Sequence, residues 1–129
     1  MRFYVASRFD GSNENIQEIN NLCSAIADAG IECFHATRDM VGPFAGQKEL
    51  WLAARKNIQE CDAILVDISD VPTGGRLVEV GIAYALNMPV YIIVKNDIQY
   101  KSFYDGIATA IYKYDEINDI TVELKYLNI

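Results

Sequence analysis

The sequence predicts an α/β fold in which one five-stranded parallel sheet is covered by helices on both faces. Short apolar runs typical of buried strands alternate with segments whose apolar residues repeat at helical spacing. The connections between these segments are short, and no repeat, low-complexity tract or linker interrupts the 129 residues. This alternation is typical of a doubly wound, flavodoxin-like or Rossmann-like three-layer sandwich. We therefore expect residues 1–129 to form a single domain.

The expected strands are short and apolar. The segment DAILVDI is a continuous apolar run, as in strands from the middle of a parallel sheet. In the first strand, alternation places Tyr4 and Ala6 on one face and Phe3 and Val5 on the other. The five strands are expected at residues 2–6, 31–35, 62–68, 89–94 and 109–113.

The expected helices follow these strands in order. The first has a plausible N-cap in Ser12 and a plausible stop in Gly30. The third, over RLVEVGIAYAL, is expected to pack through a stripe that consists of Leu77, Val80, Gly81 and Tyr84. The five helices are expected at residues 13–29, 47–60, 76–86, 101–108 and, closing the chain, 115–127.

The composition excludes several functional classes. The net charge of −7 argues against binding to a nucleic-acid polymer, which needs a basic face. The three cysteines are isolated and odd in number, which favours free thiols in a reducing compartment over a metal site. The start MRFYVASRFDG does not resemble a signal peptide, and no apolar run approaches the ~20 residues that span a membrane. We expect a soluble, cytoplasmic protein without membrane contact.

A ligand site is expected where the strands end, because doubly wound sheets bind ligands at the carboxyl ends of their strands. The segment DISDVPTGGRLVE places several polar groups there. Asp67 ends a buried strand, and Ser69 and Asp70 open the following loop. The two glycines at 74 and 75 form a tight turn that exposes backbone N–H groups. Glu79 lies in the first turns of the next helix.

Glu79 has two interpretations. A glutamate near the start of a helix stabilises the helix dipole by ~0.3–1 kcal/mol, which requires no further function. A carboxylate in a cleft, flanked by Asp67 and Asp70, is also suited to attack or to stabilise a cationic carbon. The second interpretation makes Glu79 a catalytic candidate.

The same region resembles a known family. The strand AILVDIS, the glycine-containing turn, the helix pattern E-x-G-x-A-x-A and the following x-P-V-Y resemble the nucleoside 2-deoxyribosyltransferase family. That family includes the 2′-deoxynucleoside 5′-monophosphate N-glycosidases. FYVASRF and AARKNIQECDA resemble its first strand and the helix before its third strand. The residues that carry the match are Glu79, Gly81, Ala83, Ala85, Pro89 and Val90.

The resemblance implies cleavage of the N-glycosidic bond of a small nucleoside or nucleotide. Glu79 would attack C1′ and form a glycosyl-enzyme ester, which a second base or water would then release. Asp67 or Asp70 would supply a proton or hydrogen bond to the leaving base, and the choice between them stays open. No metal or organic cofactor is implied.

The resemblance and the loop positions together indicate substrate contacts. The transferases carry an aspartate six positions before the nucleophile, where this chain has Thr73. Arg8 and Arg76 could cradle a 5′-phosphate, because guanidinium forks suit phosphate oxygens, although each could equally be a solvated surface arginine. Ser102 lies where the family borrows a residue from a neighbouring subunit, which implies a homo-oligomer with shared active sites. The expected substrate contacts are Tyr4, Ser7, Arg8, Ser69, Thr73, Gly74, Gly75, Arg76 and Ser102.

Two other functions remain open. An NAD-cleaving domain of the TIR group also places a catalytic glutamate in such a sheet, and a nucleotide-sensing module would keep the pocket without turnover. A Walker nucleotidase and a Rossmann cofactor site are excluded because their glycine motifs are missing. His35, the only histidine, stands at the end of the second strand, where a packing role is expected.

Overall fold

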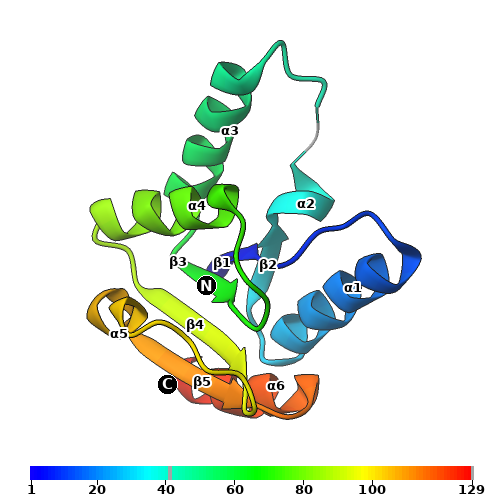
Figure 1. Cartoon of the computed structure of the whole chain (residues 1–129), viewed down its shortest axis with the longest axis vertical. Helices are drawn as coiled ribbons and strands as arrows, with labels where there is room; N and C mark the ends of the chain where they lie inside the picture. Colours follow the sequence, from blue (N-terminus) through cyan, green and yellow to red (C-terminus); the bar gives the residue numbers. More distant parts are fainter. Residues whose placement is uncertain (41, 129) are drawn as a thin grey trace.

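The computed structural model describes residues 1–40 and 42–128, which form a three-layer α/β sandwich (Figure 1). Every strand pair in the sheet is parallel, and the strand order is β2-β1-β3-β4-β5. The predicted fold class is therefore confirmed. The strands are β1 (Arg2–Ala6), β2 (Glu32–His35), β3 (Ala63–Asp67), β4 (Val90–Lys95) and β5 (Ala110–Tyr114).

The order of the strands fixes where a crevice opens. The chain leaves β1 toward β2 on one side, and then returns across the sheet to β3 on the other side of β1. Tyr4 pairs with Ile64 and Ala6 pairs with Val66, so β1 and β3 end at the same edge. The reversal between these two strands is the point where ligands bind in doubly wound sheets.

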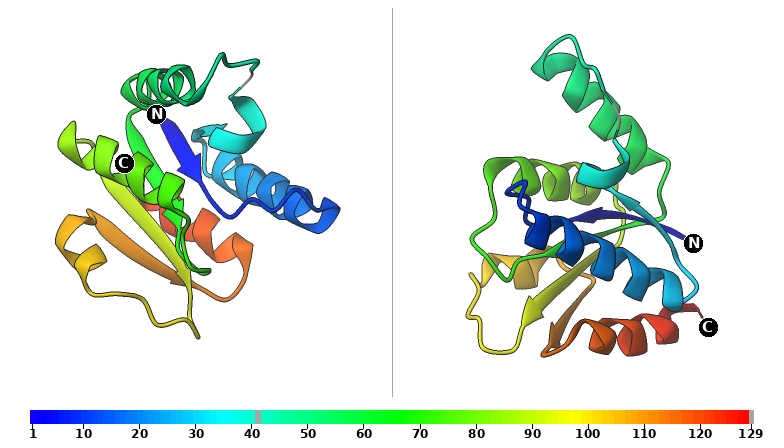
Figure 2. Two further views of the ribbon diagram at one scale, coloured as in Figure 1. Left: turned by 45° about the horizontal axis from the view of Figure 1, so that its top comes forward. Right: turned by 90° about the vertical axis from the view of Figure 1, so that its right-hand side faces the viewer.

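Helices cover both faces of this sheet. Helices α1 (Asn13–Asp28) and α6 (Ile117–Lys125) pack together on one face (Figure 2). Helices α3 (Gln47–Gln59), α4 (Gly74–Ala85) and α5 (Phe103–Ile107) cover the opposite face. A 3-10 turn, η1 (Tyr126–Asn128), follows α6. As the alternation predicts, Tyr4 and Ala6 join the core beneath α3 and α4, whereas Phe3 and Val5 join the core beneath α1 and α6.

The predicted ends of the first helix are confirmed. The Ser12 side chain accepts a hydrogen bond from the backbone N–H of Asn15, which caps α1. Gly30 has a φ of 81°, the left-handed conformation that stops a helix. Helix α2 (Ala36–Asp39) lies between the strand expected at 31–35 and the helix expected at 47–60. Its start is held by the His35 side chain, which accepts from the Thr37 N–H.

The predicted packing stripe of α4 is wrong in three of its four positions. Leu77, Gly81 and Tyr84 are exposed, and Val80 alone of the four is buried. The buried side chains of α4 are instead Arg76, Glu79, Val80 and Ala83. This face of α4 can pack toward the sheet because Arg76 is bound at the end of β3 and Glu79 is bound by Tyr4 of β1, which makes their burial tolerable. The prediction was wrong because it used apolar residues alone and therefore placed charged residues such as Arg76 and Glu79 on the solvent side of the helix.

In the part of the chain that the structure describes, no helix combines the length and apolarity that crossing a membrane requires.

Candidate active site

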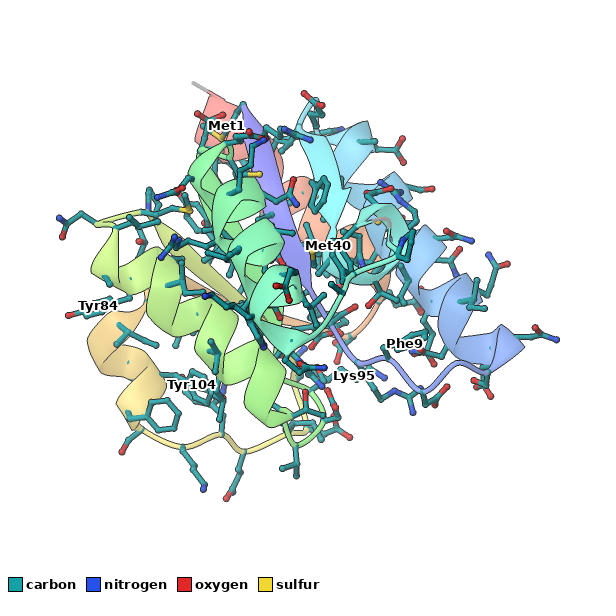
Figure 3. All side chains as sticks on the ribbon, turned by 90° about the horizontal axis from the view of Figure 1, so that it is seen from above. Met1, Phe9, Met40, Tyr84, Lys95 and Tyr104 are labelled. Atoms are coloured by element: carbon teal, nitrogen blue, oxygen red, sulfur yellow. The ribbon has the colours of Figure 1, made fainter. Side chains whose placement is uncertain are left out.

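Two adjoining hollows open at the carboxyl edge of the sheet. The larger, about 460 Å³, lies beside α1 and α6 and includes Asp67, Asp70 and Lys95 in its wall. The smaller, about 200 Å³, lies beside α2 and α4 and includes Phe9 and Glu79. Ser7 lines both hollows, so the loop after β1 forms their common wall. Figure 3 labels Phe9 of the smaller hollow and Lys95 of the larger.

Glu79 is buried in the second turn of α4 and is bound by a tyrosine from strand β1. The Tyr4 hydroxyl, itself fully buried, donates a hydrogen bond to Glu79 Oε2. Burial raises the pKa of Glu79, although the Tyr4 hydrogen bond and the Arg76 charge act in the opposite direction. Among the described residues no hydrogen bond reaches Oε1. Glu79 is thus a fixed, poorly solvated carboxyl group with one oxygen left for a ligand.

Arg76 ties the loop between β3 and α4 to the end of β3. Its Nη1 donates to the Asp67 carbonyl at 2.9 Å and to Asp70 Oδ1 at 2.7 Å, and its Nη2 donates to Asp70 Oδ2 at 2.7 Å. Burial by itself would raise the pKa of Asp70, but the Arg76 guanidinium outweighs it and holds that pKa below its usual range. Asp70 is therefore an ionised partner of Arg76 at neutral pH, which makes it a poor proton donor.

Asp67 has a different set of partners in the larger hollow. Its Oδ1 accepts from the Ser69 backbone N–H at 2.9 Å, and its Oδ2 accepts from the Tyr114 hydroxyl at 2.8 Å. Burial, with the charge of Asp67, raises the pKa of Tyr114 and keeps this hydroxyl a donor. Sequence reasoning missed Tyr114. The sequence signal for Tyr114 was its place at the end of the fifth strand. The last residues of all five parallel strands lie at the same edge of the sheet, where the ligand site was expected.

Ser7 is held by the buried histidine. The His35 Nδ1 accepts the Thr37 backbone N–H at 3.1 Å, so in neutral His35 the ring proton lies on Nε2. Nε2 lies 2.8 Å from Ser7 Oγ and donates to it. Burial lowers the pKa of His35 to about 4, which keeps the ring neutral at physiological pH. Because Ser7 Oγ accepts from His35, its own hydroxyl proton is available to a ligand.

The remaining predicted contacts differ in where they lie. Arg8 lines the larger hollow but is exposed and is paired with Glu18 and Asp10. Arg76, the other expected phosphate contact, has both ends of its fork bound to Asp70. The structure brings the following predicted residues to one hollow or the other: Ser7, Arg8, Asp67, Ser69, Asp70, Thr73, Gly75, Arg76 and Glu79. Tyr4 reaches the site through Glu79, whereas Gly74 and Ser102 line neither hollow. Within the described residues, no three His, Cys, Asp or Glu side chains gather as they would around a metal ion.

The Tyr4 hydrogen bond predicts a measurable shift at Glu79. In Tyr4→Phe the carboxylate loses its donor, so we expect the pKa of Glu79 to rise further, because that bond favours the ionised form. The pKa is followed by ¹³C NMR of protein labelled at the glutamate carboxyl carbon. Tyr100→Phe is the matched control, since the Tyr100 hydroxyl donates to Asp105 outside both hollows. An unchanged or lowered Glu79 pKa in Tyr4→Phe would contradict the role given to this bond.

The fold and the buried Glu79 at the carboxyl edge of its sheet can now be compared with known protein families. The family model for nucleoside 2-deoxyribosyltransferase matches residues 3–126. The chain belongs to the nucleoside 2-deoxyribosyltransferase family, as its resemblance implies. A comparison with curated protein sequences finds no match.

Solved structures of related fold include enzymes that act on nucleosides and nucleotides. The 2-deoxyribosyltransferase of Bacillus psychrosaccharolyticus has a TM-score of 0.72 at 17% identity, over 96% of each chain. The CMP N-glycosidase BcmB of Clostridium botulinum has a TM-score of 0.71 at 16% identity, over 98% of this chain and 99% of that one. The TIR domains of the Roq1 resistosome are less similar, with a TM-score of 0.56 at 13% identity, over 98% of this chain and 71% of that one. At these identities the likeness concerns the fold alone.

Proposed function

We propose that this protein cleaves the N-glycosidic bond of (deoxy)nucleosides or their 5′-monophosphates, with Glu79 as the nucleophile. Membership of a glycosyl transferase and N-glycosidase family supports the reaction class. The observation that carries the assignment of Glu79 is its position: it is buried, oriented by Tyr4, and lines a hollow at the sheet edge. A carboxylate of this kind can form a covalent ester with an electrophilic sugar carbon.

The proposed reaction has two steps. In the first, Glu79 attacks C1′ through an oxocarbenium-like transition state, the C1′–N bond breaks, and the base leaves with a proton or a hydrogen bond from the protein. In the second, water or another base attacks C1′ and restores the free carboxylate. Asp67 is favoured over Asp70 for contact with the leaving base, because the donors to Asp67 are neutral groups of Ser69 and Tyr114, whereas Asp70 is ion-paired through both oxygens with Arg76. Neither step needs a cofactor.

The β1 loop is the proposed contact for the sugar or its 5′-phosphate. The Ser7 hydroxyl is free to donate, and Ser7 lines both hollows. Arg8 stands beside it but would have to leave Glu18 and Asp10 to reach a phosphate. Arg76 is better assigned to holding the loop than to binding phosphate. Thr73 and Gly75 line the smaller hollow beside Glu79.

A homo-oligomer remains part of the proposal. Helix α4 exposes the apolar side chains of Leu77, Val78 and Tyr84, and Phe103 of α5 is also half exposed. An apolar face of this kind supports association with a second copy. Ser102, next to Phe103, could then contact the active site of a neighbour rather than that of its own chain. A cytoplasmic location is proposed from the sequence alone.

The experiment that tests the function is a substrate survey analysed by chromatography. Purified protein is incubated with each nucleoside, deoxynucleoside and corresponding 5′-monophosphate, with and without a second free base, and with NAD in a separate arm. Free base released without an acceptor would identify a hydrolase, and a new nucleoside formed only with an acceptor would identify a transferase. NAD cleavage alone would replace the proposal with the TIR-like function, for which the shared sheet is the supporting observation. Tight binding without any turnover would replace it with nucleotide sensing.

A further inference from the structure

Two of the three cysteines lie against each other, although the sequence contains no pair motif. Cys23 lies in α1 and Cys33 in β2, and the Cys33 thiol is 3.3 Å from the Cys23 sulfur and donates to it. Cys61 belongs to the core on the opposite face of the sheet, so it cannot join them. Cys23 and Cys33 therefore form a pair of neighbouring thiols, and Cys61 lies apart from them.

The position of the pair favours a covalent bond. A disulfide has an S–S distance of about 2.05 Å, so the two sulfurs must approach each other by little more than about 1 Å. Strand β2 lies at the edge of the sheet and pairs with β1 alone among the described strands, while side chains of α2, Arg38 and Asp39, also bind its backbone. Cys23 is buried and Cys33 is half-buried, so a small oxidant reaches the pair from the Cys33 side.

The surroundings of the pair favour a thiolate. The hydrogen bond from Cys33 lowers the pKa of Cys23, and burial opposes that change. The nearby Arg38 guanidinium adds to the lowering, and the Asp39 carboxylate that pairs with Arg38 counteracts it. Arg38 is fixed close by, because its Nη2 donates to the Cys33 carbonyl at 2.9 Å. A thiolate stabilised by a second thiol and a cation is the form that reacts with peroxides.

We propose that Cys23 and Cys33 form an oxidation site that closes to an intramolecular disulfide in the presence of hydrogen peroxide. A thiolate of the pair attacks one peroxide oxygen, the O–O bond breaks, and hydroxide leaves to give a sulfenic acid. The second sulfur then attacks the first, the S–O bond breaks, and the oxygen leaves as water with the proton of the second thiol. Overall, two thiols and one peroxide give one disulfide and two waters.

The disulfide would join α1 to β2 across a short turn. It would therefore stabilise the protein by restricting the unfolded chain. Strand β2 also carries His35, two residues after Cys33, and His35 holds Ser7. The oxidation site is thus connected through one strand to the candidate active site, but the proposal does not depend on the function assigned to that site.

The test compares reduced protein with protein treated with about one equivalent of hydrogen peroxide. We expect the titratable thiols, counted after unfolding, to fall from three to one, with a mass loss of ~2 Da and no chain-to-chain disulfide in denaturing, non-reducing electrophoresis. Peptide mapping should join Cys23 to Cys33. The melting temperature should rise by several degrees and return to its original value with dithiothreitol.

Variants separate this outcome from general oxidation. Cys61→Ala should still lose both remaining thiols and ~2 Da, whereas Cys23→Ser and Cys33→Ser should form no intramolecular disulfide. The proposal is overturned if peroxide leaves all three thiols titratable, if it adds oxygen without joining Cys23 to Cys33, or if the disulfide includes Cys61 or a second chain. These readouts do not use the enzymatic activity, so failure of the proposed function would not affect them.

Discussion

Replacing Glu79 with glutamine is expected to abolish N-glycosidic cleavage and to leave a folded protein that is more stable at neutral pH. Glutamine cannot form the glycosyl ester, so kcat on the substrate identified in the survey should fall by at least about 10³-fold. The amide oxygen can still accept the Tyr4 hydrogen bond, which preserves the packing of α4 against β1. Loss of activity should therefore not reflect unfolding.

The gain in stability follows from the direction of the Glu79 pKa. Burial raises that pKa in the folded state above its unfolded value, so the folded state binds the proton more readily. The stability that Glu79 contributes is thus fully present below its unfolded pKa and is lost as the pH rises through its folded pKa. Above its unfolded pKa Glu79 destabilises the fold, because the folded state disfavours the ionised carboxylate that the unfolded chain carries, and Glu79→Gln removes this effect. The melting temperature of the variant should exceed that of the wild type at about pH 7, and the difference should shrink toward about pH 4.

A matched control shows whether the effects of Glu79→Gln depend on the position of the residue or follow from any Glu-to-Gln replacement. Glu123 is an exposed glutamate on α6, and Glu123→Gln should change neither kcat nor the melting temperature. Single-turnover assays and thermal unfolding across pH measure the two effects independently. Glu79→Gln retaining more than about a tenth of the wild-type kcat would remove Glu79 from the nucleophile role. Lower stability at neutral pH would show that the carboxylate is not under the electrostatic strain that its burial implies.

Much of the fold could be predicted from the sequence because its strands and caps are local features. The apolar run at 62–68 is typical of a buried strand in a parallel sheet, and it occupies the centre of the sheet. Ser12 and Gly30 mark the ends of α1 through chemistry confined to a few residues. The carboxyl edge of a doubly wound sheet then indicates where polar loop residues gather, and this is where Ser69, Asp70 and Glu79 lie.

The partners of these residues could not be predicted, because they come from distant parts of the chain. Glu79 is bound by Tyr4, 75 residues earlier, and Asp67 is bound by Tyr114, 47 residues later. The burial of Arg76 depends on the same kind of contact, and it rotates α4 away from the face that its apolar pattern indicates. Spacing along a helix shows which residues share a face, but the polar groups at the strand ends decide which face is buried.

Neutral, buried His35 is expected to make the folded state lose stability as the pH falls below about 6.5. Burial lowers its pKa from 6.5 to about 4, so between these values the unfolded chain is protonated while the folded chain is not. The stability contributed by the neutral ring is thus fully present above the unfolded pKa and is lost as the pH falls toward the folded one. Between about pH 7 and pH 4.5 the loss should reach about 2 to 3 kcal/mol, because a tenfold change in proton affinity corresponds to about 1.4 kcal/mol.

The measurement is urea unfolding across this range for a pair of variants that differ only at residue 35. Glu79→Gln serves as the background, because it removes the opposite pH dependence of Glu79 from the same range. Adding His35→Gln leaves no histidine in the chain. Over this pH range the free energy of unfolding of the double variant should change by about 2 to 3 kcal/mol less than that of Glu79→Gln alone. Asp39 and Asp70 do not interfere, because their lowered pKa values place their titration below this range.

Nitrogen-15 NMR of the His35 imidazole tests whether a neutral ring causes this pH dependence of stability. With the Thr37 N–H bound to Nδ1, the spectrum at about pH 6 should show a neutral ring protonated at Nε2. In Ser7→Ala the His35 ring should keep the same tautomer. The Ser7 contact is lost, but the Thr37 N–H still donates to Nδ1 and so keeps the ring proton on Nε2. A ring that is protonated at Nδ1, or that titrates near 6.5, would mean that His35 does not hold Ser7 as a ligand donor. With the proton on Nδ1 of a neutral ring, Nε2 would accept the Ser7 hydroxyl proton, which would then not be directed to the substrate.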